Sequence, residues 1–115
     1  MNKRNRLSRS RDFDAVYRQG RSVSTRFLVL YWFAREEGPG DARLGLAVPK
    51  AAGNAVVRNR IKRQLREVWQ ARLPEIPGDN DYVLIAKPGL PEATAANGFD
   101  WLSARVDEVL GMAVA

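Results

Sequence analysis

The 115-residue chain contains neither cysteine nor histidine. The missing cysteines exclude disulfides and thiolate metal sites, and the missing histidines exclude imidazole ligands, Ser-His-Asp and Cys-His catalysis. No apolar run approaches the roughly 18 residues that span a membrane, and the basic start lacks the apolar segment of a signal peptide. We therefore expect a cytoplasmic protein with no membrane partner.

The acidic residues offer little for metal binding. Asp12 and Asp14 would point to different sides of a helix, and Asp79 and Asp81 flank Asn80 in a predicted turn. Neither spacing is typical of a two-metal site. Neither pair therefore predicts a metal site, and any catalysis by this chain alone would have to use carboxylates, Lys, Tyr or a carboxylate-held metal.

Charge is divided unevenly along the chain. The net charge is +6 and the sequence pI is about 10.3. Residues 1–66 hold 16 of the 19 basic residues but only 5 of the 13 acidic ones, whereas residues 67–115 hold 3 basic and 8 acidic residues. This distribution predicts a polyanionic partner that contacts the N-terminal part.

The length suits one domain, residues 1–115, and the pattern predicts an α+β two-layer sandwich in the order α-β-β-α-β-α. We expect a basic flexible arm at 1–10 and a helix at 12–19 that ends at Gly20. Strands at 22–34 and 43–48 would form an antiparallel pair. A helix capped by Asn54 would run to about Arg72, followed by a strand at 82–86 and an amphipathic C-terminal helix.

Alternation separates the two faces of the first strand. Leu28, Leu30 and Trp32 share one face, which we expect to enter the core, and Phe27 and Tyr31 share the other. An aromatic pair spaced as Phe13 and Tyr17 lies on one side of a helix, and such a pair is commonly core.

The helix after Asn54 combines an apolar stripe with an adjoining basic arc. Five of the nine positions from Arg58 to Arg66 are basic, and no acidic residue follows until Glu67. Ordinary solvated faces mix both signs of charge, whereas cations at i, i+4 spacing repel one another unless phosphates lie between them. The pattern favours nucleic-acid binding over a solvated face, with Arg60 lying off the main arc.

Residues 53–67, GNAVVRNRIKRQLRE, closely resemble the signature helix and preceding loop of the bacterial ribonuclease P protein subunit, including its Arg58-Asn59-Arg60 core. The resemblance covers about residues 3–87, including Asn5-Arg6-Leu7, Asp12-Phe13 and the two strands that follow. One departure is clear: the family usually has two lysines before the glycine loop, and this chain has Lys50 followed by Ala51.

The resemblance implies a protein that partners a large catalytic RNA, the ribonuclease P RNA, with one protein per RNA subunit. The complex removes the 5′ leader from precursor tRNA by endonucleolytic hydrolysis. The RNA and its Mg²⁺ ions would perform the chemistry, and the chain would hold no covalently bound cofactor. The family also implies a ribosomal-protein-like fold, a central mixed sheet with a left-handed βαβ crossover, although right-handed crossovers are the general rule.

The resemblance also implies roles for individual residues. The single-stranded leader would bind in a groove between the first helix and the sheet, lined by Phe13, Tyr17, Val29 and Tyr31. The catalytic RNA and the nucleotides near the cleavage site would be contacted by Lys50, Arg58, Asn59, Arg60, Lys62, Arg63 and Arg66. A basic arm that orders on RNA, or else a solubilising tail, would carry Lys3, Arg4, Arg6, Arg9 and Arg11.

Three other functions remain open from the sequence. A general RNA-binding protein would have similar affinity for precursor and mature tRNA. An autonomous metal-dependent nuclease would cleave without an RNA subunit. A helix-turn-helix DNA reader is disfavoured because strands flank the basic helix.

Overall fold

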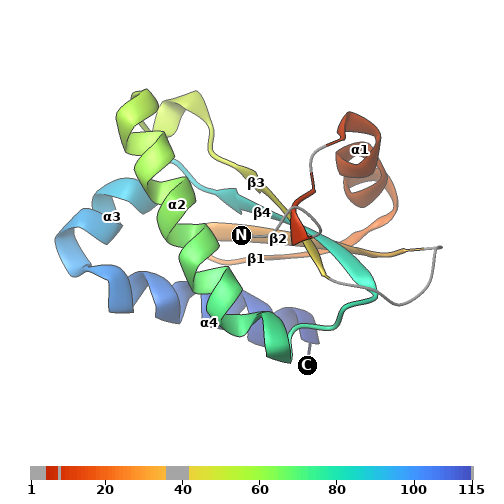
Figure 1. Cartoon of the computed structure of the whole chain (residues 1–115). Helices are drawn as coiled ribbons and strands as arrows, with labels where there is room; N and C mark the ends of the chain where they lie inside the picture. The colour runs from red at the N-terminus through yellow and green to blue at the C-terminus, as the bar shows by residue number, and fades with distance from the viewer. Residues whose placement is uncertain (1–4, 8, 36–41, 115) are drawn as a thin grey trace.

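The computed structural model describes residues 5–7, 9–35 and 42–114. Figure 1 shows α1 above a four-stranded sheet and α4 below it. The strands are β1 (Arg21–Ser24), β2 (Leu28–Ala34), β3 (Arg43–Ala47) and β4 (Asn80–Ala86). The helices are α1 (Ser10–Gln19), α2 (Ala55–Arg72), α3 (Leu90–Asn97) and α4 (Phe99–Val114), and short 3-10 turns occupy Lys50–Ala52 and Leu73–Glu75.

The strand order is β1-β2-β4-β3, with β3 and β4 parallel and the other pairs antiparallel. The predicted antiparallel pairing of the strands at 22–34 and 43–48 is therefore wrong, because β4 lies between β2 and β3. Strand β4 is apolar on both faces, which suits a central position. The expected strand at 22–34 is two strands, separated by a turn in which the backbone N–H of Thr25 donates to the carbonyl oxygen of Leu28 at 2.8 Å.

The β3-α2-β4 connection is a left-handed crossover. In Figure 1, α2 passes in front of the sheet, β3 and β4 both run toward the upper left, and β4 lies below β3. When this view is turned so that the two strands point upward, β4 is to the left of β3. The predicted mixed sheet of an α+β fold is confirmed, including the unusual handedness that the resemblance implied.

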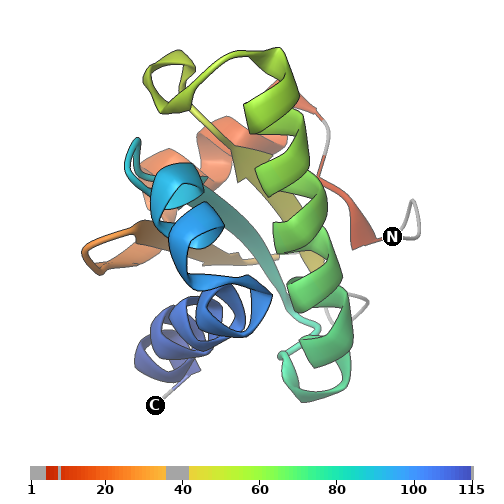
Figure 2. The same ribbon diagram turned by 90° about the vertical axis from the view of Figure 1, so that its left-hand side faces the viewer.

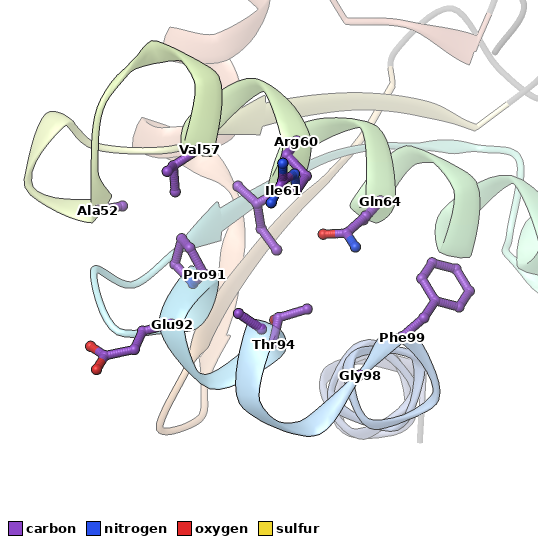
Figure 3. Close-up of a pocket in the computed structure, with 11 residues that line it drawn as sticks. Ala52, Val57, Arg60, Ile61, Gln64, Pro91, Glu92, Thr94, Gly98 and Phe99 are labelled. Carbon is purple, nitrogen blue, oxygen red and sulfur yellow. The ribbon is translucent and has the colours of Figure 1, made fainter.

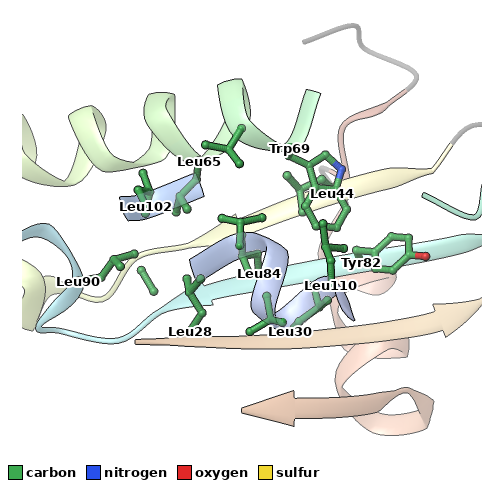
Figure 4. Close-up of a cluster of buried hydrophobic side chains, with 14 of the residues drawn as sticks. Leu28, Leu30, Leu44, Leu65, Trp69, Tyr82, Leu84, Leu90, Leu102 and Leu110 are labelled. Carbon is green, nitrogen blue, oxygen red and sulfur yellow. The ribbon is translucent and has the colours of Figure 1, made fainter. Parts of the chain in front are cut away.

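The main core lies between the sheet and α2, α3 and α4, which pack side by side (Figure 2). Leu28 and Leu30 point into this core from β2, as the alternation predicted, and belong to one buried cluster with Leu65 of α2 and Leu102 of α4 (Figure 4). Phe27 does not share the face of Tyr31. The chain bends before β2 begins, and the Phe27 ring packs edge-on against Trp101 of α4, with 5.0 Å between ring centroids.

Helix α2 begins where its cap predicts. The Asn54 side chain accepts a hydrogen bond from the backbone N–H of Val57 at 3.0 Å, which satisfies one of the free amides of the first turn. Ile61, Leu65 and Val68 form the buried stripe of the helix. The cap sets where the helix begins, and the stripe sets which side of it is buried. Together they determine the side of α2 on which the basic arc lies.

A second, smaller cluster lies on the opposite face of the sheet, under α1. It is built from Leu7, Val16 and Val83, all buried. Asn5 and Leu7 attach to the edge strand β3 through hydrogen bonds from Asn5 Nδ2 to the Ala42 carbonyl at 3.0 Å and from the Leu7 N–H to the Leu44 carbonyl at 2.9 Å. Residues 5–7, which belong to the expected arm at 1–10, therefore lie along the edge of the sheet, where β3 offers unpaired backbone groups.

Two arginines of the basic N-terminal part serve the fold. Arg43 donates from Nε and Nη2 to the two carboxylate oxygens of buried Asp81, at 2.8 and 2.7 Å. Arg35 Nε lies 3.8 Å from the same carboxylate, and Arg35 Nη2 donates to the carbonyl of Gly78. A bidentate pair of this kind ties β3 to β4 at the end where both strands begin.

Candidate RNA-binding site

Helix α1 brings three of the predicted groove residues together. The Tyr17 ring meets Tyr31 of β2 edge-on at 5.2 Å between centroids, and Phe13 lies 6.4 Å from Tyr17. Tyr17 is 40% exposed, whereas Phe13 and Tyr31 are half-buried. We call Phe13, Tyr17, Val29 and Tyr31 the aromatic patch.

The Tyr17 hydroxyl stays protonated at neutral pH. Partial burial raises its pKa above the ordinary value of 10.0, and the neighbouring Tyr31 raises it further. The patch therefore offers neutral ring faces and edges, which suit base stacking better than a phenolate would.

Phe13 is both a patch residue and a packing residue. It contacts the cluster under α1, and its ring occupies the space above Gly45 of β3. A Cβ at Gly45 would lie 2.4 Å from Phe13 Cζ and 3.3 Å from Leu7 Cδ2. Glycine at position 45 therefore allows the ring to lie against the sheet.

Replacing Gly45 with Ala is expected to displace Phe13 and to destabilise the protein by about 1 to 3 kcal/mol, the usual cost of overpacking. Urea unfolding of Gly45→Ala beside the wild type measures this. A double variant, Gly45→Ala with Phe13→Leu, should recover part of the loss because the smaller side chain relieves the contact. Equal stability of Gly45→Ala and the wild type would contradict this packing.

The sheet beside the patch has an uncharged floor. Val29 pairs with Ile85, which pairs with Ala47, so the three lie in one row across β2, β4 and β3. All three are half-buried. The sequence identified Val29 through the family and missed Ile85 and Ala47. It missed Ile85 because the run at 82–86 is apolar throughout and does not reveal its faces.

The basic arc of α2 lies on one flank of the helix, as its spacing predicted. Asn59 and Arg63 are exposed, and Lys62 and Arg66 are half-buried. Arg58 donates from Nε to the Gly53 carbonyl at 3.1 Å, so it also holds the loop before the helix. Lys50 is exposed in the turn that precedes this loop.

Within the part of the chain that the structure describes, no carboxylate lies within ion-pair distance of the cations on this arc. Their charge is therefore left to solvent or to a partner. Mixed-sign surfaces neutralise themselves, and this one does not.

Arg60 faces the other flank of α2, toward α3. It lines a cavity of about 570 Å³ together with Gln64, Pro91 and Phe99, and Gln64 points into the space between the helices (Figure 3). The structure thus separates Arg60 from the other predicted RNA contacts of the helix, as its position off the arc indicated.

The N-terminal cations divide into two groups. Arg6, Arg9 and Arg11 are exposed beside the attached segment and the start of α1, whereas Lys3 and Arg4 lie outside the described residues.

Among residues 5–7, 9–35 and 42–114, no helix is long and apolar enough to cross a membrane. The same ranges hold no group of three or more histidine, cysteine, aspartate or glutamate side chains placed to bind a metal.

The basic flank of α2 has no acidic partner among the described residues, and it shares a small α+β scaffold with a partly exposed aromatic patch. These two features define a class of protein whose surface suits single-stranded nucleic acid. The comparisons narrow this class. The family model for ribonuclease P matches residues 1–113. The chain belongs to the ribonuclease P protein component family, whose members are part of the endoribonuclease that processes tRNA.

Relatives resemble the chain over nearly its whole length. The ribonuclease P protein component of Acidothermus cellulolyticus is 43% identical over 108 residues, 94% of this chain and 87% of that protein. The Staphylococcus aureus RNase P protein superposes with a TM-score of 0.85 at 32% identity, covering 96% of each chain. The Thermotoga maritima protein gives a TM-score of 0.82 at 28% identity, covering 93% of this chain and 96% of that one.

Proposed function

We propose that this protein binds the catalytic RNA of ribonuclease P and the single-stranded 5′ leader of precursor tRNA, and so promotes removal of the leader. The RNA subunit, with its Mg²⁺ ions, performs the hydrolysis, and one protein serves each RNA subunit. The observation that carries the leader role is the aromatic patch, in which Tyr17 presents a partly exposed ring against Tyr31 beside an uncharged floor. Aromatic rings beside cations hold single strands without strong sequence preference.

The catalytic RNA binds the basic flank of α2. Arg58, Lys62 and Arg66 follow one another at i, i+4 spacing, so their charges form a line along the helix. Such a line matches the phosphates of a folded RNA, and Lys50, exposed in the turn before the helix, adds a further cation. Asn59 and Arg63 on the same flank, Arg60 on the other, and the exposed N-terminal cations Arg6, Arg9 and Arg11 add contacts.

Replacing Tyr17 with Ala tests the leader role. We expect the complex of Tyr17→Ala with ribonuclease P RNA to bind precursor tRNA more weakly by about 1 to 3 kcal/mol, the value of one base stack. Its affinity for mature tRNA should be unchanged. Equilibrium binding of both tRNAs at one salt concentration measures the difference.

Tyr17→Phe is the matched control, because it keeps the ring and removes only the hydroxyl. We expect it to bind the precursor as the wild type does. If Tyr17→Ala weakened precursor and mature tRNA equally, or neither, the patch would not hold the leader, and a general RNA-binding function would fit better.

A further inference from the structure

The cavity of about 570 Å³ lies between α2 and the corner where α3 meets α4, and we call it the α2–α3 cavity. Val57 and Ile61 of α2 and Pro91 of α3 give it apolar walls. Cavities of this size that combine apolar walls with a few polar groups are typical of sites for small organic groups. Neither the basic arc of α2 nor the aromatic patch borders this space, so it is a separate candidate site.

Phe99 presents an aromatic ring to the cavity from the first position of α4. The side chain is 38% exposed, whereas Trp101 of the same helix packs against Phe27. The Phe99 ring points toward α2 (Figure 3). The corner before it depends on Gly98, whose φ of +94° is a conformation that residues with a side chain rarely adopt. This sharp turn of the backbone places a partly exposed ring at the cavity.

Two polar side chains of α2 border the cavity without a partner. Arg60 and Gln64 lie one turn apart on the same flank of the helix. Among the described residues, neither the guanidinium of Arg60 nor the side-chain amide of Gln64 forms a hydrogen bond or an ion pair. The carboxylate of Glu92, which also lines the cavity, points away from both groups (Figure 3). A ligand in the cavity therefore meets an unpaired cation and an unpaired amide.

The cations of α2 continue from its basic flank to the cavity. At about 100° per residue, Arg60 lies about 60° from Arg63 around the helix, and both side chains are exposed. An RNA bound along the basic flank therefore reaches Arg60 by following the exposed side of the helix. This continuity of charge favours RNA as the occupant over a second protein.

The three groups at the cavity match the three parts of a nucleotide. An aromatic ring such as that of Phe99 stacks on the face of a nucleobase. The amide of Gln64 both donates and accepts hydrogen bonds, as the edges of the bases do. The guanidinium of Arg60 suits a phosphate.

We propose that the α2–α3 cavity receives one unpaired nucleotide of the ribonuclease P RNA, with its base held by Phe99 and Gln64 and its phosphate by Arg60. The site depends on the proposed function, and it gives α3 and α4 a direct part in binding the catalytic RNA. The leader is not the occupant, because the aromatic patch lies on the opposite face of the sheet, under α1.

Replacing Phe99 with Ala removes the stacking ring. We expect Phe99→Ala to bind ribonuclease P RNA about 10-fold more weakly, the value of one base stack. The slope of log affinity against log salt should not change, because no phosphate contact is lost. Arg60→Gln should instead lower this slope by about 0.7, the contribution of one phosphate of a single strand. Filter binding across a salt series separates the two effects.

Three further variants control for the fold and for general surface effects. Phe99→Trp keeps a stacking ring and should bind as the wild type does. Met112→Ala removes a half-exposed apolar side chain from the other end of α4 and should change nothing. Gln64→Ala enters the cavity without touching the buried stripe of α2, and it should weaken RNA binding with an unchanged salt slope. Urea unfolding of each variant checks that the fold is retained.

Chemical probing of the RNA in the complex locates the nucleotide. Dimethyl sulfate modifies accessible A and C, and a carbodiimide modifies accessible U and G. We expect one unpaired base that the wild type and Met112→Ala protect to become reactive in the complexes of Phe99→Ala and Gln64→Ala.

Three results would overturn the site. The first is wild-type affinity and protection for both Phe99→Ala and Gln64→Ala, and the second is weaker binding in which no single base gains reactivity. The third is loss of self-association of the protein with RNA binding unchanged, which would make the cavity a contact between two copies of the chain. A failure of the proposed function looks different, because the wild type itself would then not bind ribonuclease P RNA.

Discussion

Replacing both Lys62 and Arg66 with Ala is expected to weaken binding to ribonuclease P RNA by about 100-fold, since each charged hydrogen bond to phosphate contributes about 1.5 kcal/mol. Both side chains lie on the basic flank of α2 without a carboxylate partner among the described residues. The slope of log affinity against log salt should fall by about 0.9 for each lost phosphate contact. Filter binding across a salt series measures both quantities.

This pair is a cleaner test than one that includes Arg58, because the Arg58 side chain also holds the Gly53 carbonyl. The matched control removes two cations that are already paired, Arg72 with Asp107 and Arg105 with Glu108. It changes the net charge equally and should leave the salt slope unchanged. A wild-type slope for the Lys62 and Arg66 variant would refute the assignment of this flank to RNA.

Replacing Asp81 with Ala should destabilise the protein by about 3 kcal/mol, because it leaves Arg43 and Arg35 without the buried carboxylate that they share. The Asp81 side chain is only 6% exposed, which makes the loss large for an ion pair. Urea unfolding measures the change in the free energy of unfolding.

The neighbouring Asp79 provides the control for this effect. It is exposed, and Asp79→Ala should cost less than about 0.5 kcal/mol, as surface substitutions usually do. Equal stability of the two variants would mean that the Asp81 network contributes nothing to the fold.

Local signals made part of this structure predictable. The Asn54 cap and the apolar stripe placed α2 and the direction of its basic arc, and alternation placed Leu28 and Leu30 in the core. These features depend on residues near one another in the chain. The left-handed crossover came only from the family resemblance, because the physical rule favours the opposite hand.

Contacts between distant segments could not be predicted. The order of the strands depends on where β4 inserts, and without that order Ile85 has no assigned face. The attachment of Leu7 to β3 and the space above Gly45 that Phe13 fills likewise need partners from other segments. The residues of the aromatic patch were therefore predicted from the sequence, whereas the uncharged floor beside it emerged from the structure.

The central claim is tested most directly by mixing the protein with a bacterial ribonuclease P RNA at low Mg²⁺ and following 5′ cleavage of a precursor tRNA. Protein alone and RNA alone serve as controls. We expect efficient cleavage only in the mixture, with an advantage for precursor over mature tRNA binding. Tight RNA binding without stimulation across a Mg²⁺ and salt series, or cleavage by the protein alone, would contradict the account.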